Sequence, residues 1–258
     1  LKPIWPSAQL AGAARRRTPG ASLRHLCPPA MGDSAKQPLL GPRGLPEVSQ
    51  KEVAQESAKM LKMLVAMLTV PRVVGIGSAF LVLTFGASGL YRVKLGKIAE
   101  NDLGYLYLSA FVMSALVQWL NVYPMLFKQK LLIKGNMRAN MCFFKMCVAG
   151  PATGKPTPYV VMEEEGVVGE YNRANRSMFH FNENLGGVLL NLLLAGFVFP
   201  LPAFVCVVVF ALGRVLHQVG YASGGYGKHA PGFMLTMLAM FCLEGMVLIA
   251  ALGAFGVL

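Results

Sequence analysis

Charged residues are scarce in this chain of 258 residues. Only 14% of the residues are Asp, Glu, Lys or Arg, whereas 55% are hydrophobic. A soluble globular domain is usually about 25% charged. The scarcity of charge therefore excludes an ordinary soluble domain and indicates a protein of the membrane.

Cysteine is also scarce, and its pattern excludes two further classes. The five cysteines contain no CxxC pair and are not spaced with the four histidines as metal ligands. We expect neither a disulfide framework nor a metal site.

Acidic residues are half as numerous as basic ones, 12 against 24, so the net charge is +12. Eleven of the Lys and Arg residues precede residue 73 and six lie between residues 128 and 155. Both groups flank hydrophobic segments, as the positive-inside rule expects of cytoplasmic segments. The excess of Lys and Arg is therefore explained by the orientation of the protein in the membrane, and nucleic acid is not expected as a partner.

Five hydrophobic segments are each near the ~20 residues that a membrane-spanning helix needs. They are Val73–Tyr91, Leu103–Phe127, Asn172–Phe199, Ala203–Tyr221 and Phe233–Phe255. The sequence thus predicts an all-α, multi-pass integral membrane protein, with Pro71 and Arg72 at the edge of the first span. Residues 128–170 form a polar connection, and PLP at 200–202 and SGGYGKHAPG at 223–232 form turns. If the N-terminal tail is cytoplasmic, the basic link at 92–102 lies on the opposite side of the membrane, which disagrees with the positive-inside rule. The disagreement disappears if the first span lies along the interface or forms a hairpin.

Three parts are expected along the chain. Residues 1–62 are a basic leader and a disordered tail, residues 63–92 an extra N-terminal span, and residues 103–256 a membrane domain. The first 32 residues contain no acid. They suit either an organelle transit peptide or untranslated sequence ahead of a start at Met31, and both alternatives stay open.

Ionisable residues within two of the spans recur at helical intervals. One set is Arg176, His180 and Glu183, and the other is Arg214, His217 and Tyr221. Spacings of three and four place each set on one side of a helix. A charge left in hydrocarbon costs roughly 2.5–3.5 kcal/mol. Polar groups of this kind can also serve only to join helices, but two arginines and one carboxylate leave a positive charge over, which favours a polar cavity.

The charges of this cavity suit a particular ligand. Two guanidinium groups fit two carboxylates, because Arg binds carboxylate through a bidentate fork. Glu183 suits an ammonium group. Two carboxylates and one amine are the charged groups of glutathione.

Two segments also carry a family resemblance. GEYNRANRSMFHFNE at 169–183 and GRVLHQVGYASG at 213–224 resemble the signatures of the MAPEG proteins, membrane-associated proteins in eicosanoid and glutathione metabolism. The resemblance is strongest to the type 3 microsomal glutathione S-transferases. It covers residues 160–256, with Leu103–Phe127 as the family's first helix, whereas the extra N-terminal span has no counterpart.

The resemblance implies a four-helix bundle that forms a homotrimer and binds glutathione between subunits at the cytoplasmic side. The glutathione-binding positions it implies are Arg176, His180, Glu183, Arg214, His217 and Tyr221. His180 replaces the family's Asn, and His217 replaces its Tyr. The catalytic positions it implies are Lys228, where several members place an Arg against the glutathione sulfur, and Tyr221. Tyr226 is a weaker candidate as a hydroxyl donor.

The expected function is a membrane-bound glutathione transferase and peroxidase that acts on lipophilic electrophiles or lipid hydroperoxides. Glutathione is the co-substrate and its thiolate the nucleophile. The endoplasmic reticulum is the expected membrane, with a mitochondrial outer or plastid membrane as alternatives. Two other functions stay open: a non-enzymatic lipid-binding protein of the same fold, and an accessory subunit of an organelle membrane complex.

Overall fold

A computed structural model describes residues 49–86, 88–131, 141–149 and 157–258. All of them belong to one unit of the chain, Pro38–Leu258. The basic leader, most of the expected tail and parts of the polar connection lie outside the described residues.

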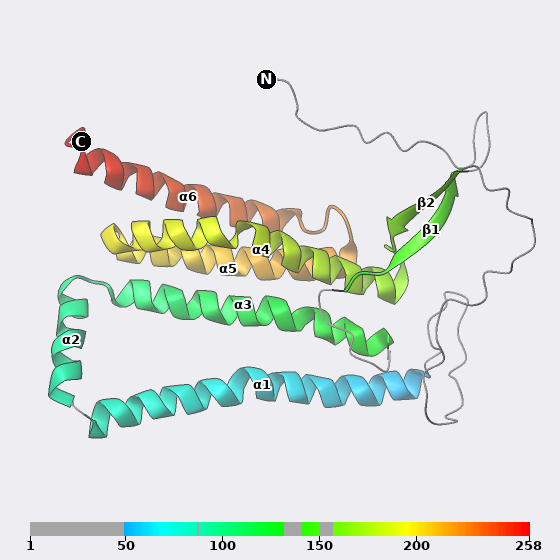
Figure 1. Ribbon diagram of the computed structural model, residues 1–258, viewed down its shortest axis with the longest axis horizontal. Helices are drawn as coiled ribbons and strands as arrows, with labels where there is room; N and C mark the ends of the chain where they lie inside the picture. The colour runs from blue at the N-terminus through cyan, green and yellow to red at the C-terminus, as the bar shows by residue number, and fades with distance from the viewer. Residues whose placement is uncertain (1–48, 87, 132–140, 150–156) are drawn as a thin grey trace, which may run out of the picture. The chain divides into compact units, whose positions relative to one another are not determined.

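The described part of the chain contains six helices and one β-hairpin (Figure 1). They are α1 (Gln50–Phe85), α2 (Ser88–Glu100), α3 (Gly104–Leu131), β1 (Phe144–Ala149), β2 (Thr157–Met162), α4 (Gly166–Val198), α5 (Pro200–Gly224) and α6 (Ala230–Ala254). All the helices except α2 are long and apolar enough to cross a membrane. The helical membrane fold that the sequence predicts is confirmed.

Helix α1 starts earlier and ends earlier than the first predicted span. It begins at Gln50, within the range expected to be disordered, behind a capping box in which the Ser49 and Glu52 side chains bind each other's backbone N–H groups. It ends at Phe85, so Val73–Phe85 is only about 20 Å of helix, too short for the ~30 Å hydrocarbon core. The predicted spanning part Val73–Tyr91 is therefore not one continuous helix, and a spanning α1 would have to reach back past Arg72, the predicted edge of the span.

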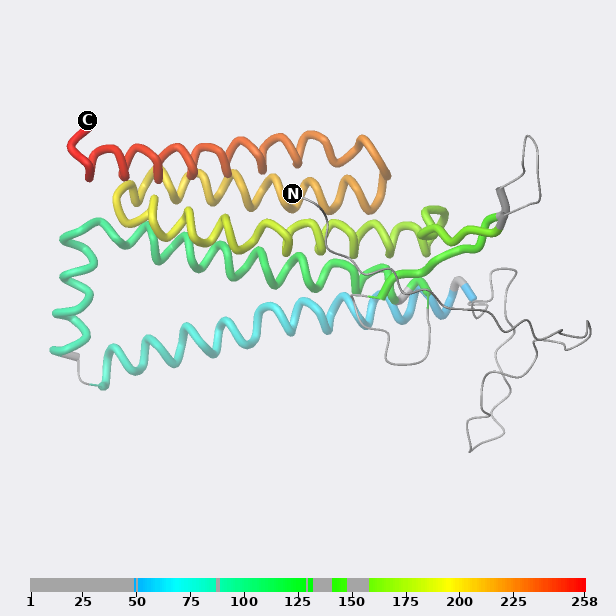
Figure 2. Tube along the Cα trace, turned by 45° about the horizontal axis from the view of Figure 1, so that its top comes forward, coloured from blue at the N-terminus to red at the C-terminus, as the bar shows by residue number. Residues whose placement is uncertain are grey.

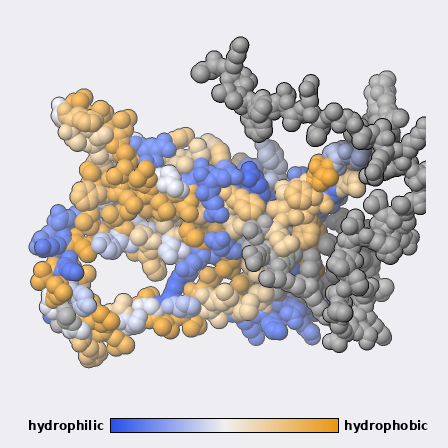
Figure 3. All heavy atoms as spheres, in the orientation of Figure 1, coloured by the Kyte–Doolittle hydropathy of each residue, from blue (hydrophilic) through white to orange (hydrophobic). Residues whose placement is uncertain are grey.

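The helices α3 to α6 form a bundle, and α1 lies beside it against α3 (Figures 1 and 2). The bundle core consists of tightly packed aliphatic and aromatic side chains, among them Leu120, Phe181, Val207, Phe210 and Leu243. Apolar side chains on the outer surface are exposed, as Figure 3 shows along α6. A surface of this kind suits lipid contact.

The connection between α4 and α5 is tighter than the predicted PLP turn. Phe199 alone separates the two helices, and Pro200 opens α5. A proline is tolerated in the first helical turn, where its missing N–H has no partner to lose. The two helices are therefore antiparallel neighbours.

The polar connection contains a hairpin that was not predicted. Strands β1 and β2 pair antiparallel, with Phe144 opposite Met162. The side chain of Asn172 in α4 holds its base: the Nδ2 group donates to the carbonyls of Phe143 and Glu163, both at 2.8 Å. Lys145 of β1 lies 3.1 Å from the Glu163 carboxylate, and this hydrogen bond raises the pKa of Lys145.

The basic link at 92–102 lies mostly in α2, at the end of the bundle away from the hairpin (Figure 1). The disagreement with the positive-inside rule therefore stands.

Candidate functional site

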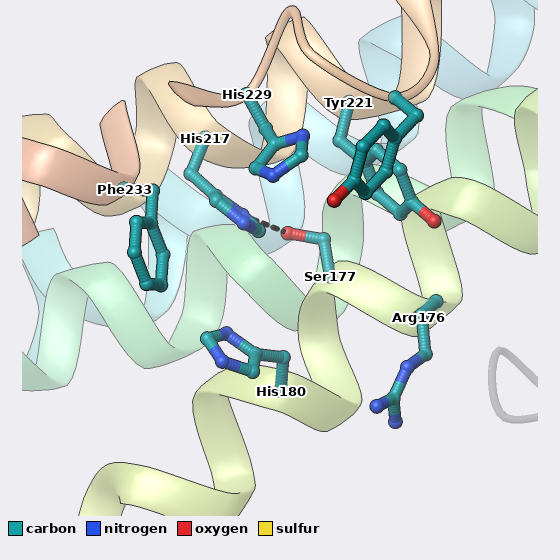
Figure 4. A pocket seen from close by; sticks show the side chains of 8 residues that line it. Arg176, Ser177, His180, His217, Tyr221, His229 and Phe233 are labelled. Atoms are coloured by element: carbon teal, nitrogen blue, oxygen red, sulfur yellow. Dashed lines mark hydrogen bonds between the residues drawn. The ribbon is translucent and has the colours of Figure 1, made fainter. Parts of the chain in front are cut away.

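The antiparallel packing of α4 and α5 brings the two predicted polar sets together. The candidate site lies near the start of α4, the end of α5 and the start of α6 (Figure 4). His180 of α4 faces His217 of α5, and the two rings stack with centroids 5.6 Å apart. One member of each predicted set thus lies beside a member of the other.

A glycine allows α6 to approach α5 closely. A Cβ atom on Gly232 would lie 2.2 Å from the backbone nitrogen of His217 and 2.5 Å from the carbonyl oxygen of Gly213. Because no side chain separates the helices here, His229 and Phe233 are held against the His217 ring.

His217 is the centre of the site. It is 5% exposed. Its Nδ1 atom lies 2.9 Å from the Oγ atom of Ser177 (Figure 4). The His229 ring meets it edge-on, with centroids 5.2 Å apart. Within the described residues, no group of three or more His, Cys, Asp or Glu side chains is placed to hold a metal ion.

These side chains surround a cavity of about 230 Å³, here called the polar cavity. Its lining residues are Arg176, Ser177, His180, His217, Tyr221, Tyr226, His229 and Phe233. It therefore includes four of the six predicted glutathione-binding residues.

Arg214 lies behind His180 rather than in the polar cavity. Arg214 is 1% exposed, with Nη1 3.1 Å from Nδ1 of His180 and Nη2 donating to the carbonyl of Ser177 at 2.8 Å. The Phe181 ring centroid is 5.5 Å away. Across the described residues, no carboxylate pairs with Arg214 and its Nε atom has no hydrogen-bond partner. The site thus keeps an uncompensated positive charge.

Arg214 borders a second cavity of about 250 Å³, here called the apolar cavity. Its lining residues are His180, Phe181, Asn184, Phe210, Arg214, Phe233, Thr236, Met237 and Met240. His180 and Phe233 line both cavities and so form the wall between them.

Arg176 and Glu183 bind each other at the surface of α4. The Nη1 atom of Arg176 lies 3.0 Å from the carboxylate of Glu183, and the two side chains are 50% and 55% exposed. Arg176 lines the polar cavity, whereas Glu183 lines neither cavity. Within one subunit, Arg176 and Arg214 therefore line different cavities, and His180 lines both.

Lys228 also lies outside both cavities. Its side chain is exposed and runs along α5, where a Cβ atom on Gly224 would lie 2.5 Å from its Cγ. The next residue, His229, occupies the polar cavity instead, and its buried Nδ1 atom has no partner among the described residues.

Sequence reasoning missed three members of the site: Ser177, His229 and Phe233. Ser177 is three residues before His180 and so shares its helix face, a signal that was available. The contacts of His229 and Phe233 depend on how α6 packs against α5, and the spacing of residues along the sequence does not predict that packing.

Arg173 supports the site from outside. Its Nε and Nη2 atoms donate to the carbonyls of Tyr221 and Ala222 at the end of α5, at 3.0 and 2.9 Å. These bonds tie the start of α4 to the last turn of α5 and hold Tyr221 beside the polar cavity.

A family model described as the MAPEG family matches residues 104–252, from the start of α3 almost to the end of α6. No curated protein and no solved structure matches the chain significantly.

Proposed function

Because the chain belongs to the MAPEG family, we propose that it is a membrane-bound glutathione transferase with glutathione peroxidase activity. The observation that carries this proposal is the pair of adjoining cavities, one lined mainly by basic and hydroxyl side chains and one in which Phe and Met side chains are the majority. The proposed assembly is the homotrimer that the resemblance implies, and the proposed membrane is the endoplasmic reticulum.

The polar cavity is the proposed site of glutathione. The peptide carries a net negative charge, which the uncompensated Arg214 attracts through the wall of the cavity. Arg176 and Glu183 bind each other, and the proposal has them exchange that contact for a carboxylate and an ammonium group of the ligand. Charge-assisted hydrogen bonds of this kind are worth ~1.5–3 kcal/mol each.

The apolar cavity is the proposed site of the lipophilic electrophile or lipid hydroperoxide. Phe and Met side chains line it, and methionine adapts to ligands of different shape. Because His180 and Phe233 line both cavities, a sulfur atom near this wall meets a reactant arriving from the bilayer. Holding two reactants together in this way converts a bimolecular encounter into a local one.

The chemistry requires a base or a cation near the sulfur. The unpartnered Nδ1 atom of His229 is placed to accept the thiol proton, and Tyr221 is placed to donate a hydrogen bond to the thiolate. In conjugation, the thiolate sulfur forms a bond to the electrophilic carbon, and the proton is returned to the product or the leaving group. In peroxide reduction, the sulfur attacks the peroxide, the alcohol leaves, and a second glutathione completes a disulfide with release of water.

Lys228 remains a proposed contributor through its charge, from the exposed turn next to His229. Lys228 occupies the position that is expected to stabilise the thiolate, yet it lies outside the polar cavity. This favours a second candidate function, that of a non-enzymatic lipid-binding protein.

Purified protein in lipid nanodiscs separates these functions. We expect saturable glutathione binding together with conjugation of a lipophilic electrophile or reduction of a lipid hydroperoxide. Binding of glutathione or lipid without turnover would favour the lipid-binding function. The absence of both glutathione binding and turnover would overturn the proposal.

A further inference from the structure

Two helices on opposite edges of the bundle, α1 and α6, are both long and apolar enough to cross a membrane, and they carry charges of opposite sign, Arg72 and Glu244. Arg72 is thirteen residues before the end of α1, and Glu244 is ten residues before the end of α6. Both helices finish at the end of the bundle that lies away from the hairpin (Figures 1 and 2). At 1.5 Å per residue the two positions are about 20 and 15 Å from these ends, so both fall within a hydrocarbon core of ~30 Å.

Arg72 has one neutral partner. Its Nη2 atom donates to the side-chain oxygen of Gln118 in α3 at 2.8 Å. A guanidinium has five N–H donors, and in the described part of the chain no carboxylate is paired with this one. Its charge is therefore not neutralised within the subunit.

Glu244 is exposed and makes no hydrogen bond or ion pair with any described residue. It follows Met237 by seven residues and Met240 by four, and both methionines line the apolar cavity. Because these spacings repeat one face of a helix, Glu244 lies on the face of α6 that borders this cavity. An unpaired charge at this depth is strongly unfavourable and usually marks a functional contact.

The two charges belong to helices that pack on different neighbours. Helix α1 packs on α3, whereas α6 packs on α5 and α4 (Figure 1). We propose that α1 of one copy packs against α6 of the next copy, so that Arg72 binds Glu244 across the interface. A contact between two different edges of identical subunits is head-to-tail, and it closes into a ring when the rotation allows.

The surfaces next to the two charges suit helix packing in lipid. A Cβ atom on Gly75 in α1 or on Gly245 in α6 would meet nothing within 4 Å. Small residues let membrane helices approach closely, and the gain in packing and polar contacts drives their association. Helix α1 would then also flank the apolar cavity of the neighbouring copy. This contact gives a role to α1, the extra N-terminal span that the four-helix unit of the family does not have.

Disulfide trapping in membranes tests this contact with both charges intact. Two copies with different tags, in a background where the native cysteines are replaced, carry Gly75→Cys and Leu248→Cys, one turn beyond Arg72 and Glu244 respectively. Both positions face open space or are exposed, and α1 and α6 run in the same direction (Figure 1). We expect a product that carries both tags. The control Ile249→Cys, 47% exposed but about 140° around α6 from Glu244, should give little product.

The charges are then tested in the same trapped pair. Reversing one charge, by Arg72→Glu or Glu244→Arg, should lower the yield of the mixed product by about tenfold, equivalent to about 1.4 kcal/mol. Exchanging both charges should restore it. The neutral variants Arg72→Gln and Glu244→Gln serve where a reversed charge prevents membrane insertion, and they should also lower the yield. Equal trapping at Ile249, no mixed product, or a yield that ignores the charges would each overturn the proposal, and none of these readings depends on glutathione.

Discussion

Adding one methyl group to Gly232 tests the close approach of α5 and α6 on which the site depends. The new Cβ atom would lie 2.2 Å from the backbone nitrogen of His217 and 2.5 Å from the carbonyl of Gly213, where ordinary contacts are 3.4–4 Å. Because both opposing atoms belong to the backbone, no side-chain rotation relieves the clash, and α6 must move away. Overpacking of this kind costs ~1–3 kcal/mol, which exceeds the gain of about 1 kcal/mol from replacing a helical glycine with alanine.

The expected result of Gly232→Ala is a lower thermal unfolding temperature in detergent and weaker glutathione binding, because the shift draws Phe233 away from His217. Gly253→Ala is the matched control, since this glycine lies in the same helix and its Cβ would meet nothing within 4 Å. The control should unfold at or slightly above the temperature of the unchanged protein. A Gly232→Ala protein with undiminished stability and binding would refute the reasoning on helix contact.

The remaining predictions concern the charges and the hairpin. Replacing Arg214 with Met should weaken glutathione binding by about tenfold, measured by equilibrium dialysis, because it removes a positive charge whose attraction through the cavity wall is on the order of 1–2 kcal/mol; unchanged affinity would reject the site. Lys228→Met and His229→Gln should both leave glutathione binding unchanged, but turnover should fall mainly in the His229 variant. A larger loss of turnover in the Lys228 variant would instead assign stabilisation of the thiolate to Lys228. Asn172→Ala removes the side-chain bonds to the backbone of Phe143 and Glu163 at the hairpin base, each worth about 0.5–1.5 kcal/mol. Hydrogen exchange should therefore speed up in β1 and β2, whereas Asn121→Ala, which removes one exposed side-chain bond, should leave it unchanged.

Much of the membrane fold could be predicted because long apolar segments leave few alternatives. A segment of ~20 apolar residues satisfies its backbone in lipid only as a helix. The limits of α1 were harder, since its capping box at Ser49 is polar and its end at Phe85 falls inside an apolar run. The prediction of one continuous span over Val73–Tyr91 failed for this reason.

The hairpin escaped prediction because its strands are short and separated from the apolar spans. FKMCVA and TPYVVM contain the aromatic and β-branched residues that favour strands. The base of the hairpin, however, is bound by the side chain of Asn172, 29 residues from Phe143, and no local pattern reveals that contact.

Helical spacing predicted some of the residues that gather at the site, but neither all of its members nor how each side chain is used. Intervals of three and four put His180 and His217 on facing sides of α4 and α5. They do not decide that Arg214 turns behind His180, or that Arg176 binds Glu183 on its own helix. Those outcomes depend on side-chain rotamers and on the packing of α6.

The most direct test of the account is the occupancy of the polar cavity. We would measure equilibrium binding of radiolabelled glutathione to the full chain in nanodiscs, with an S-alkylated glutathione as competitor and Arg176→Met as the variant. The account predicts saturable binding at millimolar glutathione or below, full displacement by the competitor, and a marked loss of affinity in the variant. An isotherm that stays linear, or one that the Arg176 substitution leaves unaltered, would contradict it.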